Sequence, residues 1–428
     1  MEVVKDPFLR HLFNSDPIFN VYNSNVTNMS VGAPGPDLLK YCVDMMRAST
    51  LHRMEEEEKE GKYFLFQYGI TPGLWECREE LAKFLSKRYG DPVKRENLVL
   101  SCGATHGLQI FLTSLVAPNG IIFVEEATYM IALDVFKQFP LMKIITIPMK
   151  DDLVNLDAFD KILSKTAEET MKDIFLNDQK IFWGMFYTIP VYHNPTGMTL
   201  PPASCKLLVE LSRKYKIAVF CDDVYNLLHY CEGYPPHRLL YYDNSEDPNY
   251  IGSVVSNGSF SKILSPAIRL GWIESSSRVI NILKASGTLC SGGAVNHYVS
   301  GIITSLLHLE MEDKYLDTLI SVYKERLNAL CDSLNRYLPD CCSYRKPNGG
   351  YFVWIHLPEG IDGTAFISWC QEVYKVSAIP GNRFSHKGQL SNRLRLSYSF
   401  HSKETLQKAS KILCTALLEF IKNKEKKK

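Results

Sequence analysis

One lysine of this chain lies close to hydroxyl side chains and an arginine at short, fixed offsets. Ser259, Ser261, Lys262 and Arg269 all fall within one short segment. A lysine amine that is kept neutral and oriented becomes a nucleophile toward carbonyls, most often as a Schiff base with pyridoxal phosphate. The two serines and the arginine would then donate hydrogen bonds to the cofactor's phosphate. The simpler alternative is a solvated lysine and a surface arginine beside a serine-rich turn.

A second group of polar residues favours the interpretation of Lys262 as part of a cofactor site. Asn194, and the pair formed by Asp222 and Tyr225, each follow a β-rich run and precede turn residues. Ligands of open α/β sheets collect beyond the carboxyl ends of the strands, so these side chains are expected to share one pocket. A carboxylate can hold the pyridine nitrogen protonated, and an amide and a phenol can hydrogen-bond the 3-oxygen. Alternatively, Asp222 caps a turn and Tyr225 is a core aromatic.

The chain resembles the class I and II aminotransferases of the large pyridoxal-phosphate fold, fold type I, and is nearest to the α-aminoadipate and kynurenine aminotransferase branch. The likeness runs from Gly32 through nearly all of the remaining chain. Besides the segments above, it rests on Gln67-Tyr68-Gly69, Cys102-Gly103-Ala104-Thr105, Pro347-Asn348-Gly349-Gly350, Ile379-Pro380-Gly381 and Arg393-Leu394-Arg395-Leu396-Ser397. Any one motif is weak, but the ordered set is specific.

The resemblance implies which residues hold the cofactor's ring. Lys262 is the covalent lysine. Asp222, rather than Asp223, holds the ring nitrogen, because its offset to Tyr225 matches the Asp-x-x-Tyr pattern of the family. Tyr129 matches an aromatic residue that stacks on the pyridine ring. As a tyrosine, it could equally be half-buried packing.

The resemblance also implies a phosphate site and a homodimer. Gly103, Ala104 and Thr105 open a helix after a strand, so their backbone N–H groups would point at an anion, although an ordinary helix start would look the same. Tyr68 matches a residue that reaches the phosphate of the neighbouring subunit's cofactor. A homodimer with shared active sites is therefore expected.

Substrate recognition is expected to centre on one arginine. In the family, an arginine of the smaller domain binds the substrate's α-carboxylate, and Gly32 and Asn194 match further substrate-binding positions. Arg393 and Arg395 share one face of a predicted strand, and only the motif favours Arg395. An arginine–carboxylate pair suits any α-amino acid.

The resemblance implies transamination. Lys262 would move the α-proton as general acid and base, and the amino group of a 2-aminoadipate, kynurenine or aromatic donor would pass to an oxo acid such as 2-oxoglutarate with ping-pong kinetics. Elimination enzymes of the same fold, such as C–S lyases and aminocyclopropane-carboxylate synthase, are the alternative. Transcription regulators that carry this domain are disfavoured, because no basic helix-turn-helix precedes it.

Composition agrees with a compact soluble enzyme, and a role in amino acid metabolism is implied by the resemblance alone. The 428 residues are 46% hydrophobic with a net charge of +1, which predicts two domains and no nucleic-acid partner. The twelve cysteines lack paired metal-ligand spacing, so reduced thiols and no metal are expected. No targeting segment or membrane span is recognised, and a cytoplasmic location is predicted. The lysine-rich end after residue 422 is expected to be a solvated tail.

Alternating elements predict an α/β fold. Strand-like runs at residues 98–100, 121–124, 143–147, 181–187, 217–220 and 251–256 alternate with helical segments. This alternation predicts a large domain with a mostly parallel sheet covered by helices on both faces. Helices and a few strands after about residue 311 predict a smaller α+β domain. The expected division is an irregular N-terminal arm over 1–45, a large cofactor-binding domain over 46–310 and a small C-terminal domain over 311–428.

Overall fold

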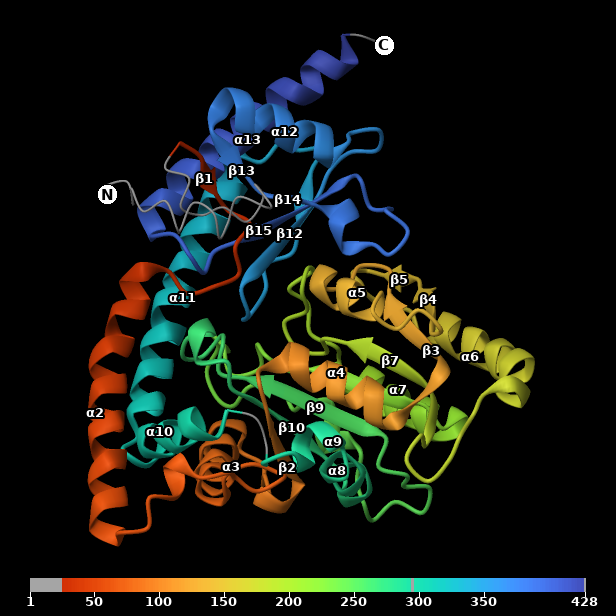
Figure 1. Cartoon of the computed structure of the whole chain (residues 1–428). Coiled ribbons are helices and arrows are strands. Elements are labelled where there is room, and N and C mark those ends of the chain that lie inside the picture. The colour runs from red at the N-terminus through yellow and green to blue at the C-terminus, as the bar shows by residue number, and fades with distance from the viewer. Residues whose placement is uncertain (1–24, 294–295, 427–428) are drawn as a thin grey trace.

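A seven-stranded sheet forms the centre of the larger part of the molecule. The computed structural model describes residues 25–293 and 296–426 (Figure 1). In spatial order the strands are β2 (Leu98–Ser101), β10 (Gly271–Ser275), β9 (Val254–Ser259), β8 (Ala218–Asp222), β7 (Phe182–Thr188), β3 (Val116–Glu125) and β4 (Lys143–Ile147). Only β10 runs antiparallel to its neighbours. The predicted mostly parallel sheet is confirmed.

Helices cover both faces of this sheet because its strands are apolar on both sides. Every residue of β8 is buried, as the continuous run Ala218-Val219-Phe220-Cys221 requires. Two apolar clusters flank the sheet, one containing residues of α4 (Ala104–Leu115) and α8 (Ser277–Lys284), the other residues of α6 (Leu156–Thr170) and α7 (Pro202–Tyr215) (Figure 1). Further helices are α3 (Trp75–Tyr89), α5 (Met130–Phe136), α9 (Gly287–Cys290) and α10 (His297–His308).

A smaller antiparallel sheet lies above the carboxyl edge of the large one (Figure 1). Its order is β11 (Ser343–Tyr344), β12 (Phe352–His356), β15 (Arg393–Ser397) and β14 (Ile379–Pro380). The helices α12 (Gly363–Tyr374) and α13 (Lys403–Glu425) pack together beside it. Short strand β1 (Thr27–Asn28) pairs in parallel with β13 (Val376–Ser377), so a segment from the beginning of the described chain joins the C-terminal elements.

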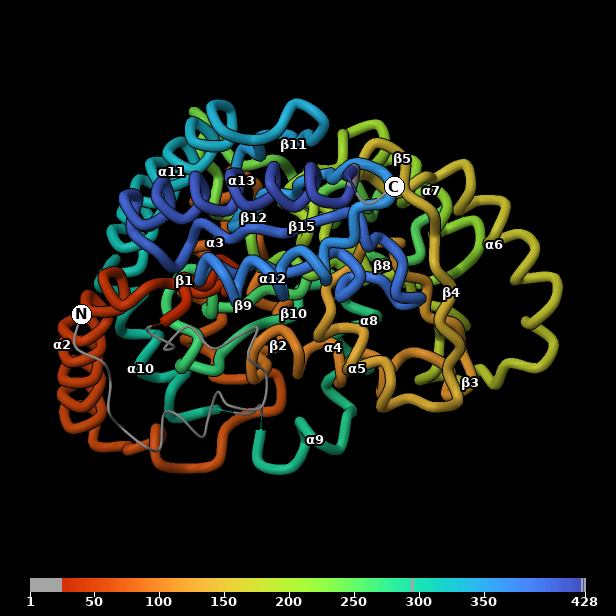
Figure 2. Tube along the Cα trace, turned by 90° about the horizontal axis from the view of Figure 1, so that it is seen from above, coloured from red at the N-terminus to blue at the C-terminus, as the bar shows by residue number. Residues whose placement is uncertain are grey.

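Two long helices run along one side of the molecule. In Figures 1 and 2, α2 (Pro36–Glu60) lies beside α11 (Met311–Tyr337), which continues toward the smaller sheet. The expectation of irregular chain up to residue 45 is wrong after Gly35. Pro36 has its φ pre-set for a first helical position, and Asp37 complements the positive end of the helix dipole. Residues 1–24 of the predicted arm, and 427–428 of the predicted tail, lie outside the described residues.

Most other predicted elements are found within a few residues of their expected places. The strand expected over 251–256 begins three residues later, at Val254. Gly252 adopts φ +64, a left-handed conformation that ends the preceding turn before the strand can start. The domain boundaries proposed near residues 45 and 310 stay predictions.

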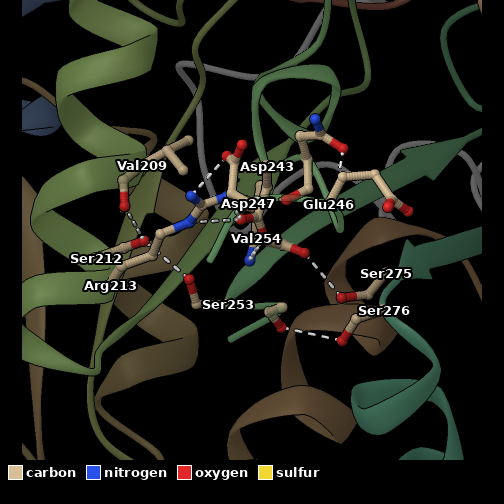
Figure 3. Close-up of polar contacts among 12 residues, drawn as sticks. Val209, Ser212, Arg213, Asp243, Glu246, Asp247, Ser253, Val254, Ser275 and Ser276 are labelled. Atoms are coloured by element: carbon tan, nitrogen blue, oxygen red, sulfur yellow. Dashed lines mark hydrogen bonds and ion pairs between the residues drawn. The ribbon is translucent and has the colours of Figure 1, made fainter. Parts of the chain in front are cut away.

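A polar network closes the amino end of the large sheet (Figure 3). Arg213 on α7 pairs with Asp243 at 2.7 Å and with Asp247 at 2.8 Å. The Ser212 hydroxyl lies 2.8 Å from that of Ser253, immediately before β9. We call these five residues the amino-end network.

The cysteines and the helices carry no sign of cross-linking or membrane insertion. All twelve cysteines lie in the described part of the chain and are free thiols. Among the described residues, no helix combines the length and the apolar character needed to cross a bilayer.

Candidate active site

Lys262 lies on the connection between β9 and β10, at the carboxyl end of the large sheet. Its Nζ donates a hydrogen bond to the backbone carbonyl of Gly32 at 2.8 Å. Burial lowers the pKa of Lys262 to about 8, and the nearby Asp222 carboxylate opposes that shift. At this pKa a larger fraction of the amine is neutral near pH 7 than in an ordinary lysine, and a nucleophilic amine has to be neutral.

A cluster of donors lies beside Lys262, at the start of α4. The Ser261 backbone N–H and the Ser261 hydroxyl lie 3.1 and 3.0 Å from the Ser259 hydroxyl. Arg269 reaches back to the carbonyl of Cys102 at 3.4 Å. Gly103 has φ +81, and a Cβ there would lie only 3.1 Å from the Arg269 guanidinium. Glycine thus lets the guanidinium approach the first turn of α4.

This cluster fits a phosphate group. No side chain caps the N-terminus of α4, so the N–H groups of its first turn are available to an anion. Ala104 and Thr105, which begin the helix, line the same cavity as Ser259, Ser261 and Arg269. Hydroxyls, a guanidinium and a free helix N-terminus are the donors that bind phosphate best.

Asp222 ends β8 and points into the cavity. Its Oδ2 accepts a hydrogen bond from the Tyr187 hydroxyl at 2.7 Å, and its Oδ1 accepts one from Asn257 Nδ2 at 3.3 Å. Burial raises the pKa of Asp222 to about 6, while the Tyr187 hydrogen bond opposes the rise. Asp223 accepts from the Ser256 hydroxyl and does not line the cavity. The geometry therefore favours Asp222 over Asp223 as the residue facing a ligand.

Arg395 on β15 closes the site from the small sheet. It is 2% exposed and donates to Asn194 Oδ1 at 2.8 Å and to the backbone carbonyl of Ser30. Its guanidinium packs 3.9 Å from the ring centre of Phe352 and 4.9 Å from that of Phe384. Burial lowers the pKa of Arg395 to about 10, and its Nε has no hydrogen-bond partner among the described residues.

Arg393 lies elsewhere, although it shares the strand with Arg395. It lines a separate cavity with Glu126, Asp152 and His356. Burial lowers the pKa of Arg393, and the charges of Asp152 and Glu126 oppose that shift. Arg393 is therefore already surrounded by carboxylates, whereas Arg395 faces neutral acceptors.

Most of the predicted residues share one cavity of about 150 Å³. The predicted residues that line it are Ala104, Thr105, Tyr129, Asn194, Asp222, Tyr225, Ser259, Ser261, Lys262 and Arg269. Three further predicted residues contact the lining. Gly103 lies next to Arg269, the Gly32 carbonyl accepts from Lys262, and Arg395 donates to Asn194. Tyr68 is the exception. It is 83% exposed and packs near Gly292, outside this cavity.

The sequence interpretation missed several groups that build the site. Tyr187 and Asn257 hold Asp222, and Phe352 and Phe384 flank Arg395. The two phenylalanines lie just beyond the motifs that end at Gly350 and Gly381, and the buried Asn257 interrupts an apolar strand, which was a usable signal. The Ser30 contact uses a backbone carbonyl and left no signal in the side-chain pattern.

A buried network also supports the loop that carries Asn194. The neighbouring His193 ring contacts Glu125 Oε2 at 2.8 Å and the Thr196 hydroxyl at 3.0 Å. The Thr188 hydroxyl donates to the other oxygen of Glu125 at 3.1 Å. These contacts tie the loop to the ends of β3 and β7, which orients the Asn194 amide toward Arg395.

The family model described as "Aminotransferase class I and II" matches residues 26–413. The chain belongs to this family. It is 30% identical over 406 residues to aromatic-amino-acid aminotransferase 1 of Thermococcus litoralis, covering 94% of this chain and 90% of that protein. The predicted family and the predicted fold type I are confirmed, and the chain is a pyridoxal-phosphate-dependent aminotransferase.

Solved structures of aminotransferases share the whole architecture. A multiple substrate aminotransferase from Thermococcus profundus superposes with a TM-score of 0.81 at 26% identity, covering 98% of this chain and 97% of that one. A kynurenine aminotransferase from Pyrococcus horikoshii, solved with PMP, gives 0.79 at 26% identity and covers 97% and 95%. The likeness therefore includes both sheets and the connections between them.

Proposed function

We propose that this aminotransferase carries pyridoxal phosphate on Lys262 and transfers the amino group of an aromatic, kynurenine or 2-aminoadipate type donor to 2-oxoglutarate. One observation carries the assignment of residues. Lys262, Asp222, Asn194 and Tyr225 converge on one cavity, and Arg395 is tied to it through Asn194. Each is also the residue type that this chemistry requires.

The cofactor's binding groups divide along the cavity. Ser259, Ser261, Arg269 and the first turn of α4 would hold the phosphate, while Asp222 would hold the ring nitrogen protonated. Asn194 and Tyr225 would donate to the 3-oxygen, and Tyr129 would stack on the ring. When bound, pyridoxal phosphate supplies an electron sink for the substrate's α-carbon.

Lys262 and Arg395 would then act on the substrate. Arg395 would exchange the Ser30 carbonyl for the substrate's α-carboxylate, which forms stronger charge-assisted hydrogen bonds. This contact orients the α-carbon relative to Lys262. A neutral Lys262 Nζ would be placed to take the α-proton and to return it on the cofactor side.

The donor class is supported by the relatives of this chain. The relatives named above are an aromatic-amino-acid, a multiple substrate and a kynurenine aminotransferase. The carboxylate arginine lies between two phenylalanine rings, with Trp354 packed edge-on against Phe384. These rings are buried and pack around the guanidinium, and none of them lines the cavity.

Two experiments test the proposal. Borohydride reduction of the loaded protein followed by peptide mapping is expected to find the pyridoxyl group on Lys262, and its presence on another lysine would refute the covalent role. A panel of phenylalanine, tyrosine, kynurenine and 2-aminoadipate with 2-oxoglutarate is expected to yield glutamate. Ammonia release without an oxo acid would instead identify an elimination enzyme.

We also propose a homodimer in which Tyr68 serves the partner's site. Its 83% exposed side chain belongs to a surface with other exposed aromatic residues, among them Phe64 and Phe66. Mixing inactive Lys262→Ala chains with inactive Tyr68→Ala chains is expected to restore activity, because one site of the mixed dimer keeps both residues. Absence of rescue in a verified mixed dimer would contradict the shared site.

A further inference from the structure

Asp222 is held by side chains from both neighbouring strands. The Tyr187 hydroxyl on β7 donates to Oδ2 at 2.7 Å, and Asn257 Nδ2 on β9 donates to Oδ1 at 3.3 Å. The parallel register brings them together, because Asp222 lies opposite Asn257 on β9. Each carboxylate oxygen therefore has its own donor.

All three side chains are removed from solvent. Tyr187 and Asn257 are 0% exposed and Asp222 is 7% exposed. A carboxylate in such surroundings loses its hydration, and only hydrogen bonds from the protein can compensate. A phenol and an amide donate to the carboxylate without adding a positive charge that would compete with a protonated ring nitrogen.

Asn257 also connects two parts of the site. The same Nδ2 lies 3.0 Å from the backbone carbonyl of Ala104, in the first turn of α4. Gly107 makes this approach possible, since a Cβ there would lie 2.2 Å from Asn257 Oδ1. The amide therefore ties Asp222 to the helix whose N-terminus faces the cavity.

We propose that Tyr187 and Asn257 are positioning residues that keep Asp222 ionised and aimed at the cofactor's ring nitrogen, with Asn257 also setting the spacing between Asp222 and the phosphate end of the site. The inference rests on the proposed role of Asp222. Tyr187 also lines the cavity, but its hydroxyl is bonded to Asp222, and Asn257 reaches the site by its bond to the same carboxylate, so both act through Asp222.

Removing the Tyr187 hydroxyl shifts the protonation equilibrium of the Asp222 carboxyl toward its neutral form. Burial already raises the pKa of Asp222, and the Tyr187 hydrogen bond is the largest effect that opposes this rise. In Tyr187→Phe the carboxyl is protonated over a wider pH range, and a neutral carboxyl no longer favours a charged ring nitrogen.

The experiment compares two cofactors on the cofactor-free protein. Dissociation constants are measured for pyridoxal phosphate and for its 1-deaza analogue, in which carbon replaces the ring nitrogen. Tyr187→Phe is expected to raise the dissociation constant of pyridoxal phosphate about tenfold, which is the effect of losing a hydrogen bond to a charged group. The dissociation constant of the analogue is expected to stay unchanged. The affinity of the Tyr187→Phe protein for pyridoxal phosphate is also expected to recover as the pH rises.

A matched control and a second variant complete the test. Tyr398→Phe removes a buried tyrosine hydrogen bond of 2.8 Å to the Gly349 carbonyl, away from Asp222, and is expected to bind both cofactors as the native protein does. Asn257→Leu is expected to lower the affinity for both cofactors, and the affinity for pyridoxal phosphate more than that for the analogue. The positioning role is refuted if Tyr187→Phe weakens both cofactors equally or neither.

Asp222→Asn separates this inference from the assignment of the site. The substitution is expected to remove the preference for pyridoxal phosphate over the analogue. If it does not, Asp222 does not face the ring nitrogen and the proposed site is wrong. If it does, and Tyr187→Phe keeps the native preference, only the positioning role fails.

Discussion

Charged side chains at the two ends of the large sheet have different partners. At the amino end, Arg213 faces two carboxylates, Asp243 and Asp247, at 2.7 and 2.8 Å (Figure 3). Burial alone would lower the pKa of Arg213, but the hydrogen bonds to Asp247 and Asp243 outweigh it and raise that pKa. The amino-end network thus neutralises its cation within the protein.

At the carboxyl end, the cations face neutral acceptors. Lys262 donates to the Gly32 carbonyl, and Arg395 donates to the Ser30 carbonyl and the Asn194 amide. Burial lowers the pKa of Lys262 to about 8 and that of Arg395 to about 10. The ion pairs at the amino end stabilise the fold. At the carboxyl end the hydrogen-bond partners of the cationic groups are neutral, so these groups can bind an incoming anion or react with a carbonyl.

The largest expected effect is on turnover. Lys262→Ala removes the group that moves the α-proton, so kcat is expected to fall about ten-thousandfold, or ~5 kcal/mol of barrier. Steady-state kinetics measure the loss. Lys206→Ala, on the exposed face of α7, is the matched control and is expected to keep native kcat. Retention of even a tenth of native activity in Lys262→Ala would contradict the covalent role.

Arg395→Ala is expected to weaken both substrates. The contact with the α-carboxylate is worth about 3 kcal/mol in a desolvated site, so KM should rise about a hundredfold or more for the donor and for 2-oxoglutarate alike. Both rise because their carboxylates occupy one place in turn. Arg393→Ala, next to Asp152 and Glu126, is expected to leave both KM values near native. The reverse pattern would assign carboxylate binding to Arg393 instead of Arg395.

The pH dependence of stability provides a third test. The pKa of Asp222 is raised from 3.8 to about 6 in the folded protein, so the folded state binds this proton more tightly than the unfolded state does. The stability of the cofactor-free protein relative to Asp222→Asn is therefore expected to fall by about 2 kcal/mol as pH rises from about 4 to about 6. Urea unfolding of both proteins across this range measures it. A flat difference would show that Asp222 is not desolvated.

At the amino end the expected effect is smaller and confined to stability. Arg213→Met leaves the Asp243 carboxylate buried without its partner, which is expected to cost about 2 kcal/mol of unfolding free energy. Thermal unfolding measures the loss, and kcat and KM are expected to stay native. A change in KM without a change in Tm would mean that the two ends of the sheet are coupled.

Sequence reasoning was strongest where one residue type is required by the chemistry. Lys262, Asp222 and Asn194 were predicted because few other residue types could serve, and the cavity brings all three together. Apolar runs such as that of β8 located the sheet for the same reason, since burial on both faces allows little else.

What sequence reasoning missed depends on contacts between distant segments. Ser30 acts through a backbone carbonyl that any residue could supply. Tyr187 looked like one more apolar strand residue, because its partner lies 35 positions away on β8. The buried polar residues of β9 are there for contacts with neighbouring strands, so the apolar pattern placed that strand too early.

The connection from β9 to β10 carries both Lys262 and Arg269. It closes as a reversal, with Ser259 paired to Gly271 across the antiparallel ladder. An inserted residue would displace the lysine, the arginine or both, so libraries that vary loop length should fail here. By contrast, a Cβ at Gly233 would meet nothing within 4 Å, and its surface turn should accept inserted tags or fused domains. The molecule thus offers engineers one loop to leave intact and another to build on.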